Sequence, residues 1–326
     1  MLKVAVIGDT TWGKTLARLS AARGAAVSVW SRTESKADEN RMEVLPQGGY
    51  GERLSFTGNI KDALKGAEFV ICAVPAQRMR DNLKLSTAHI HSTAILVSAA
   101  KGLEAETGKR MSEVIADEVK AVSPDSICAL SGPNLSAEIN QGLPATSIVA
   151  GRDLTIARKV QGLLDSPDFA VLVSDDIVGV ELCGALKNVI AVGAGIMDGL
   201  ELGNNAKAAF ITLGWKDVVS LGTAMGAKPD TFYGLAGLGD LIATGNSPLS
   251  RNHYVGCELG KGRTLSDIMK SMSQVAEGVD TAIAAHRLVK KAKLNAPIVE
   301  LVYRVLFESL PPTEISTRFK NGLKPD

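Results

Sequence analysis

The sequence predicts an α/β N-terminal domain built on a parallel sheet, followed by an all-α C-terminal domain. Three observations support this prediction. Short apolar runs alternate with amphipathic stretches over the first half of the chain, which is typical of parallel strands joined by crossover helices. Long helical patterns follow one another after about residue 180. The chain has 326 residues, 45% apolar and 22% charged, which fits two globular domains. We place these domains at 1–180 and 181–326.

The expected strands are near-continuous apolar runs, which suit strands buried on both faces. They are VAVI (4–7), AVSVW (26–30), FVICAV (69–74), AILVSAA (94–100), ICAL (127–130), SIVA (147–150) and FAVLV (169–173). A helix after the first strand is expected to begin near Trp12 and end at Gly24, because glycine favours the position after a helix. The later helices are expected at about 177–199, 204–225, 264–275, 278–293 and 297–309. Glycine-rich loops, notably YGLAGLGDLIATG and SPLSRNHYVG, are expected between them.

Charge and cysteine content argue against several classes of function. Lys and Arg number 36 and Asp and Glu 35, so no overall charge favours nucleic acid or acidic lipid. The four cysteines form no CxxC pair and have no metal-ligand spacing with the four histidines. We therefore expect no metal site, and thiols that are small buried hydrophobes of a reducing cytosol. With no signal-peptide pattern and no apolar run of membrane length, we expect a soluble cytoplasmic protein without membrane insertion.

The loop after the first strand, GDTTWGKT (8–15), matches two phosphate-binding patterns. It satisfies GxxxxGKS/T, the phosphate loop of nucleoside triphosphatases, in which Lys14 would reach the outer phosphates. It nearly satisfies GxGxxG, the dinucleotide fingerprint, in which Gly8 makes the tight turn and Gly13 allows close helix packing. The acid and the bulky Trp12 in the middle of the loop disfavour a triphosphate. Thr10, where the second glycine should stand, weakens the match to a dinucleotide.

The surroundings of this loop favour the dinucleotide. Strand, loop, helix and second strand follow within about thirty residues, as in a Rossmann-like unit. At the end of the second strand, where an acid would bind the ribose of NAD, stand Ser31 and Arg32. Arginine there can pair with a 2′-phosphate, so NAD and NADP are both admissible.

Eight further segments share their order and spacing with a known family. They are VIGDTTWGKTLA (6–17), AVPAQ (73–77), AKGLEAETGK (100–109), SGPNLSAE (131–138), LKNVIAVGAGIMDGL (186–200), GLAGLGDLIAT (234–244), SRN (250–252) and VAEG (275–278). On these segments the chain resembles the bacterial-type NAD(P)-dependent glycerol-3-phosphate dehydrogenases, from the first strand to about residue 310. The resemblance implies interconversion of sn-glycerol 3-phosphate and dihydroxyacetone phosphate, which supplies glycerol phosphate for phospholipids. It also implies a cofactor in the Rossmann-like domain, and we expect a homodimer built on the helical domain.

Lys187 is the residue expected to carry the chemistry. It lies in VGVELCGALKNVIAVGAG, a stretch almost free of charge, where a lysine commonly extends to solvent. If it is buried instead, its pKa falls toward neutrality, which suits a proton acceptor for a secondary alcohol. The resemblance implies that Lys187 is the catalytic base. Asn188 beside it either contacts a substrate oxygen or satisfies local backbone.

Other candidates have both an ordinary and a functional interpretation. Lys101 follows an expected strand, at the edge where α/β sheets bind ligands, and the resemblance implies contacts with cofactor and substrate. Asp240 either caps a helix or, by resemblance, lies beside Lys187 and binds substrate. The SRN triplet is either an ordinary helix cap with an exposed arginine or a phosphate site. The resemblance thus implies substrate binding by Lys101, Gly132, Asn134, Lys187, Asp240, Ser250, Arg251 and Asn252.

The expected cofactor-binding set combines the first loop with residues that the resemblance adds. It comprises Gly8, Thr10, Thr11, Trp12, Gly13, Arg32, Lys101, Ser136, Arg251, Val275 and Glu277. Two alternative functions stay open. One is a related two-domain dehydrogenase of a small hydroxy acid, which would lack the SRN phosphate site. The other is a catalytically idle nucleotide-binding protein, suggested by Thr10 and by Asn134, which stands where the family usually has Ser or Thr.

Overall fold

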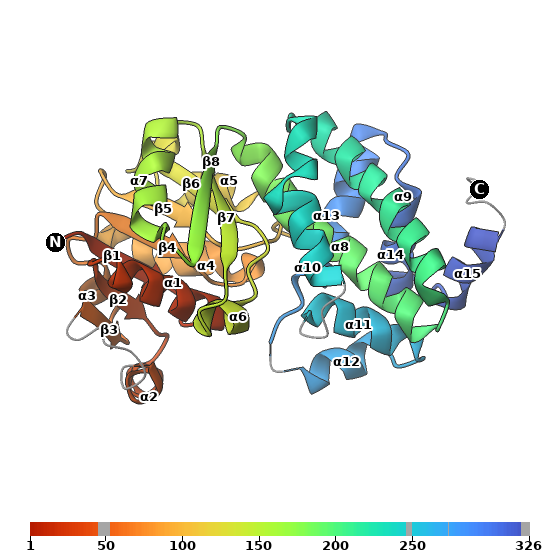
Figure 1. The fold of residues 1–326 in the computed structure, drawn as a ribbon, viewed down its shortest axis with the longest axis horizontal. Helices are drawn as coiled ribbons and strands as arrows, with labels where there is room; N and C mark the ends of the chain where they lie inside the picture. Colours follow the sequence, from red (N-terminus) through yellow and green to blue (C-terminus); the bar gives the residue numbers. More distant parts are fainter. Residues whose placement is uncertain (45–52, 246–249, 273, 321–326) are drawn as a thin grey trace. The chain divides into compact units, whose positions relative to one another are not determined.

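The chain folds into two compact units in the computed structural model, which describes residues 1–44, 53–245, 250–272 and 274–320 (Figure 1). Unit 1 comprises Met1–Ala100 and Met111–Val180, and unit 2 comprises Lys101–Arg110 and Glu181–Asp326. The short segment Lys101–Arg110 therefore belongs with unit 2, although the sequence places it among the strands of the first half.

Unit 1 is built on an eight-stranded sheet in the order β3-β2-β1-β4-β5-β6-β7-β8. The strands are β1 (Lys3–Ile7), β2 (Ala26–Trp30), β3 (Leu54–Thr57), β4 (Phe69–Cys72), β5 (Ile95–Ser98), β6 (Ile127–Ser131), β7 (Ala145–Gly151) and β8 (Phe169–Ser174). Neighbouring strands are parallel except β6 and β7. The predicted α/β fold is confirmed with a mostly parallel sheet, in which the β6–β7 pair is the antiparallel exception. The connection from β6 to β7 holds only a five-residue helix, and an antiparallel neighbour needs no crossover helix.

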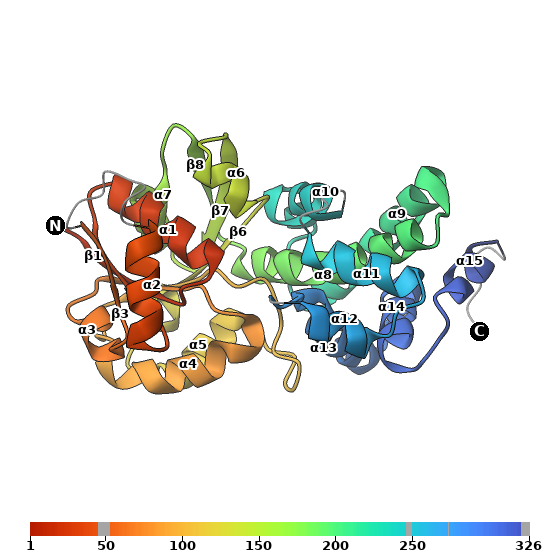
Figure 2. The same ribbon diagram turned by 90° about the horizontal axis from the view of Figure 1, so that it is seen from below.

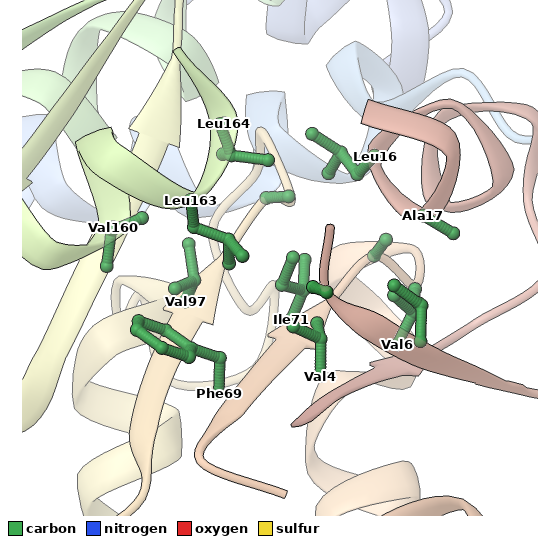
Figure 3. Packing of buried hydrophobic residues seen from close by; sticks show 14 of the residues in the cluster. Val4, Val6, Leu16, Ala17, Phe69, Ile71, Val97, Val160, Leu163 and Leu164 are labelled. Carbon is green, nitrogen blue, oxygen red and sulfur yellow. The ribbon is translucent and has the colours of Figure 1, made fainter. Parts of the chain in front are cut away.

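Helices cover both faces of this sheet. They are α1 (Thr11–Ala22), α2 (Glu34–Val44), α3 (Ile60–Leu64), α4 (Met79–Ser86), α5 (Met111–Glu118), α6 (Ser136–Asn140) and α7 (Leu154–Leu164). Figure 2 shows α1 and α7 on one side of the strands and α3, α4 and α5 on the other. Alternate residues of β1 enter two separate cores, Val4 and Val6 on one face, Ala5 and Ile7 on the other. In Figure 3, Leu16 of α1 and Leu163 of α7 approach the first of these cores.

Unit 2 is helical, as expected from the second half of the sequence. Its helices are α8 (Ile177–Gly199, which starts in unit 1), α9 (Gly203–Ala224), α10 (Asp240–Gly245), α11 (Arg251–Gly260), α12 (Leu265–Ser271), α13 (Glu277–Ala292), α14 (Pro297–Phe307) and α15 (Thr313–Lys320). In the described part of the chain, α8 is the one helix long and apolar enough to span a membrane, but 94% of that window is buried inside the protein. It is therefore the core helix of unit 2.

Two segments expected as loops contain helices. The prediction was wrong for the end of YGLAGLGDLIATG, which forms α10, and for the part of SPLSRNHYVG that opens α11; residues 246–249 lie outside the described residues. The helix expected at 264–275 ends at Ser271, and residue 273 is also outside the described residues. The sequence does not indicate these helices, because glycine lowers helix propensity. Helices of this kind are stabilised by packing in the folded protein.

The packing of α11 against α8 shows what those glycines do. A Cβ atom on Gly256 of α11 would lie 1.9 Å from the carbonyl oxygen of Val192 on α8. A Cβ on Gly195 of α8 would lie 2.1 Å from the carbonyl oxygen of His253 on α11. The two backbones are therefore in direct contact, and this contact fixes the start of α11 relative to α8.

Candidate active site

Lys187 of α8 is buried in unit 2, with 4% of its surface exposed. Its Nζ atom donates to the Thr244 hydroxyl at 2.5 Å and lies 3.1 Å from the Asp240 Oδ1 atom. The common alternative, a lysine that extends to solvent, is therefore wrong here. The apolar residues around it in the sequence leave the ammonium group with a small set of polar partners.

Burial sets the protonation of this lysine. Desolvation is the largest influence and lowers the pKa of Lys187 to about 8, helped by the nearby Lys101 and Arg251 cations. The Asp240 carboxylate acts in the opposite direction, because it stabilises the ammonium form. An amine with a pKa near 8 exchanges a proton readily at neutral pH, as an acid–base catalyst must.

Asp240 holds two lysines. It is the first residue of α10, and its Oδ2 atom accepts from Lys101 Nζ at 2.8 Å while Oδ1 faces Lys187. Burial alone would raise the pKa of Asp240, but the two cations outweigh it and keep the pKa below its usual range. The carboxylate is ionised, so it is more than the helix cap that the sequence also allowed.

Local backbone places Asp240 in this position. The preceding residues, Leu235–Gly239, form a π-helical turn that runs directly into α10, an irregularity often found at functional sites. A Cβ on Gly237 would lie 2.2 Å from the carbonyl oxygen of Phe232, so only glycine fits this turn. Thr244, one helical turn beyond Asp240, donates to Asp240 Oδ1 at 3.1 Å and so completes the polar surroundings of Lys187.

Asn188 and Asn252 join four segments of unit 2. The Asn188 amide nitrogen donates to the carbonyl oxygens of Lys101, at 2.9 Å, and Gly184, at 3.2 Å. Its oxygen accepts from Asn252 Nδ2 at 2.8 Å, and Asn252 Oδ1 accepts from Gly278 N at 2.9 Å. Of its two interpretations, satisfaction of local backbone is what these bonds show for Asn188. Asn252 keeps one amide hydrogen beyond its bond to Asn188, because an NH₂ group has two.

The other two residues of the SRN triplet open α11. Ser250 is the N-cap, because its Oγ atom accepts from His253 N at 3.2 Å. Arg251 follows as the first helical residue and is exposed. The cap interpretation and the phosphate interpretation are therefore compatible, since a capped helix N-terminus still has N–H groups without intrahelical partners beside the Arg251 side chain. Glu277, the first residue of α13, acts electrostatically on Arg251, and Val275 just before it is exposed.

In unit 1, the loop after β1 has the geometry of a phosphate cradle. Gly8 has φ +112°, and a Cβ there would lie 2.7 Å from Val74 Cγ1. A Cβ on Gly13 would lie 2.1 Å from the carbonyl oxygen of Gly8. The first N–H groups of α1, at Thr11 and Trp12, have no acceptor within the helix and point at any anion there. The loop thus fits the pyrophosphate of a dinucleotide.

Thr10 has a structural role in this loop. Its hydroxyl accepts from Gly13 N at 3.0 Å and donates to the carbonyl oxygen of Ala73 at 2.8 Å, so it is the N-cap of α1. The side chain therefore folds back on the protein. Trp12 also packs inward, with its ring 6.4 Å from that of Phe169. Lys14 Nζ donates to Asn40 Oδ1 at 3.4 Å, which directs this lysine toward α2.

The remaining candidates of unit 1 lie at other ends of strands. Arg32, two residues beyond β2, is exposed and donates through Nη2 to Asn82 Oδ1 at 3.3 Å. Gly132 follows β6 with φ +134°, and Asn134 Oδ1 accepts from the Ser147 hydroxyl at 2.9 Å. Among the residues that the structure describes, the buried Asn134 amide nitrogen has no hydrogen-bond partner. Ser136 opens the short helix α6.

Sequence reasoning missed some polar partners in both units. Thr244 carried a signal, since it stands four residues after Asp240 and so lies on the same face of a helix. Asp9 and Asn40 of unit 1 carried no such signal, because Asn40 is brought to the first loop only by the docking of α2.

The cysteines agree with the expected buried thiols. Cys72, Cys128 and Cys183 are buried, and burial raises the pKa of Cys72 to about 12. A thiol with that pKa is unreactive.

Comparison with known proteins assigns both halves of the chain to one enzyme family. Two family models match the chain, the NAD-dependent glycerol-3-phosphate dehydrogenase N-terminus over residues 3–157 and the C-terminus of the same enzyme over residues 176–317. A protein of Dehalococcoides mccartyi named glycerol-3-phosphate dehydrogenase (NAD(P)+) is 48% identical over 324 residues, which are 98% of this chain and 90% of that protein. One of the same name from Citrifermentans bemidjiense is 41% identical over 312 residues, 94% of this chain and 93% of that one.

Solved structures are similar over the same extent. The crystal structure of glycerol-3-phosphate dehydrogenase from Coxiella burnetii is 31% identical with a TM-score of 0.91, and the match covers 98% of each chain. A ketopantoate reductase from Ralstonia eutropha shares only the fold, at 11% identity and a TM-score of 0.62. The fold alone therefore does not separate these enzymes, whereas the sequence relatives do.

Proposed function

This chain belongs to the NAD-dependent glycerol-3-phosphate dehydrogenase family, and from that premise we propose how its residues carry out the reaction. The enzyme is an NAD(P)-dependent glycerol-3-phosphate dehydrogenase, which interconverts sn-glycerol 3-phosphate and dihydroxyacetone phosphate. When bound, NAD(P) supplies the hydride acceptor for alcohol oxidation and the hydride donor for ketone reduction. We assign the accompanying proton to the ε-amino group of Lys187.

The observation that supports Lys187 most directly is its burial with a pKa of about 8. In alcohol oxidation the neutral amine takes the proton of the C2 hydroxyl as the C2–H bond yields its hydride. In ketone reduction the ammonium returns the proton to the C2 oxygen. Both forms are present near neutral pH, so the same group serves both directions.

Asp240 and Lys101 have supporting roles in this proposal. The Asp240 carboxylate, 3.1 Å from Lys187 Nζ, holds the ammonium in place and stabilises it after proton uptake. Lys101 neutralises the same carboxylate at 2.8 Å and prevents it from raising the pKa of Lys187 further. Thr244 accepts a hydrogen bond from the Lys187 amine. This bond orients the amine, so that its lone pair can face the substrate hydroxyl.

The substrate phosphate is assigned to the start of α11. The exposed Arg251 guanidinium supplies a charged donor, and the first N–H groups of α11 lie at the positive end of the helix dipole. Asn252 can add its second amide hydrogen. A hydroxy acid without phosphate would leave this cationic site unused, so the site favours a phosphorylated substrate over that alternative.

The resemblance to the family also suggests a cellular role, a location and an oligomeric state for this enzyme. Reduction of dihydroxyacetone phosphate would supply the glycerol backbone of phospholipids, in the cytoplasm, by a homodimer built on the helical unit. Family membership is the basis for all three of these properties.

Kinetics of two variants test the proposal. Lys187→Ala should reduce the turnover number about 10²–10⁴-fold, the usual effect of removing a general acid–base group. Its affinity for the cofactor should stay within about threefold of wild type. Arg251→Ala should raise KM for dihydroxyacetone phosphate and leave the slow reduction of unphosphorylated dihydroxyacetone unchanged. Turnover above half of wild type in Lys187→Ala would refute the base. Cofactor binding by the wild type without any turnover would identify the catalytically idle alternative.

A further inference from the structure

Asp9 lies in the β1–α1 loop of unit 1 and is held by a buried amide of α2. Asn40, which is 0% exposed, donates from Nδ2 to Asp9 Oδ2 at 2.8 Å and to the Ser31 hydroxyl at 3.1 Å. Its Oδ1 atom accepts from Lys14 Nζ. Acceptors on the NH₂ side and a cation on the oxygen side leave the Asn40 amide a single orientation. The Asp9 carboxylate is thereby fixed in direction while remaining partly exposed.

The same amide brings Asp9 to the ribose position of the fold. Ser31 directly follows β2, where dinucleotide-binding units place the acid that hydrogen-bonds the adenosine ribose. This chain has no acid at that point of the sequence, and the Ser31 side chain is buried against Asn40. Asp9 and Ser31 accept from the same Asn40 amide group. The Asp9 carboxylate therefore lies close to the position where other dinucleotide-binding units have the acid. A carboxylate has about four acceptor sites, and Asn40 uses one of them.

We propose that Asp9 replaces the ribose-binding acid and makes this enzyme select NAD over NADP. The carboxylate would accept hydrogen bonds from the ribose hydroxyls of NAD and would repel the 2′-phosphate of NADP. Asn40 is its positioning residue. This inference rests on the proposed function, because it needs a dinucleotide in the β1–α1 loop, and it decides the cofactor preference that the sequence left open.

Lys14 and Arg32 are the cations that could instead favour NADP. Lys14 donates to the far side of the Asn40 amide, and Arg32 is exposed with its guanidinium directed to Asn82. Both have long side chains, whereas Asp9 has a short one that accepts a hydrogen bond from the buried Asn40 amide. The charge that is fixed in direction should dominate, so we expect NADH to bind about 10–100-fold more tightly than NADPH.

Binding measurements test this without turnover. Titrate wild type with NADH and NADPH, and with ADP-ribose and its 2′-phosphate as probes that lack nicotinamide. Asp9→Asn keeps the shape and the bond from Asn40 but removes the charge, so affinity for the 2′-phosphorylated ligands should rise about tenfold. Asp9→Ala should in addition weaken the unphosphorylated ligands. Asp38→Ala, which removes an exposed acid of α2 paired with Arg41, is the charge-matched control and should change neither ratio.

The outcomes separate this inference from the proposed function. A wild-type protein that binds neither dinucleotide would overturn both. Tight binding of both ligands in a ratio that Asp9→Asn leaves unchanged would overturn the role of Asp9 and keep the dehydrogenase. Preference for NADPH, lost in Lys14→Ala, would transfer the selectivity to Lys14.

Discussion

Replacing Asp240 by Asn should move the pH profile of this enzyme to lower pH in both directions of the reaction. Oxidation needs neutral Lys187, so its rate rises with pH through the pKa of about 8. Reduction needs the ammonium, so its rate falls over the same range. Asn is isosteric with Asp and removes the Asp240 charge, which stabilises the ammonium form.

The size of the effect follows from the geometry. At 3.1 Å and an effective dielectric constant of about 20, the attraction between Lys187 and Asp240 is about 5 kcal/mol. That is an upper limit, because Lys101 lies 2.8 Å from the same carboxylate and screens it. One pH unit corresponds to about 1.4 kcal/mol, so a quarter of the attraction is enough to lower the pKa of Lys187 by about one unit. We expect the profile midpoint to fall from about 8 to about 7 or below.

The assay is kcat/KM against pH for oxidation and reduction, with C2-deuterated glycerol 3-phosphate to identify the pH range where hydride transfer limits the rate. Thermal unfolding must accompany it, because an unpaired buried charge can cost about 3–5 kcal/mol of stability. Glu258→Gln is the control, since it removes a carboxylate from ion pairs with Lys261 and Arg263 at the surface. A midpoint that stays at 8 or rises in Asp240→Asn would refute the electrostatic coupling.

Three predictions concern stability, each measured by urea unfolding. Thr10→Ala should lower the free energy of unfolding by about 1 kcal/mol and Thr10→Gly by a few tenths of a kcal/mol, because each removes the N-cap of α1. Cofactor affinity should hold or improve in Thr10→Gly. A loss of cofactor affinity larger than the loss of stability would contradict this. Asp217, 6% exposed, accepts from Ile298 N at the start of α14 and has its pKa raised by burial to about 6. Its folded pKa exceeds the unfolded one, so from pH 4 to pH 7 wild type should lose up to about 3 kcal/mol relative to Asp217→Asn, and parallel stability curves would contradict the raised pKa. Gly256→Ala should cost more than about 3 kcal/mol, because its Cβ would lie 1.9 Å from the Val192 carbonyl oxygen; a fully stable variant would mean that α11 can shift freely.

Much of the fold could be predicted because apolar periodicity reflects burial directly. Seven of the strands follow continuous apolar runs, and α8 matches its expected range of 177–199. β3 was missed because LSFT is too short and alternates between buried and exposed residues. The helices α10 and α11 were missed for a different reason. Glycine lowers intrinsic helix propensity in both, and in α11 the close approach of the α8 backbone to Gly256 explains why glycine stands there.

The candidate site was predictable to the extent that its residues lie near each other in sequence or resemble a family motif. Lys187, Asp240 and Lys101 are 139 positions apart at the extremes, and no periodicity in one sequence brings them together. The resemblance supplied that grouping, and the structure supplies the distances. Asp9 is the opposite case, because no motif considered for the loop gives this position a role and the contact with Asn40 is what draws attention to it.

The charges around Lys187 explain why its pKa lies between that of a solvent lysine and that of an isolated buried one. Two ammonium groups and one carboxylate share the cluster, so it carries a net positive charge when Lys187 is protonated and none when it is neutral. Burial favours the neutral state, and Asp240 opposes that preference. Lys101 pairs with the other oxygen of Asp240 and weakens its effect on Lys187, so burial remains the stronger influence on the pKa of Lys187. Dihydroxyacetone phosphate brings negative charge that the protonated cluster attracts, so the protonation state that favours binding of this substrate is also the state that donates the proton in its reduction.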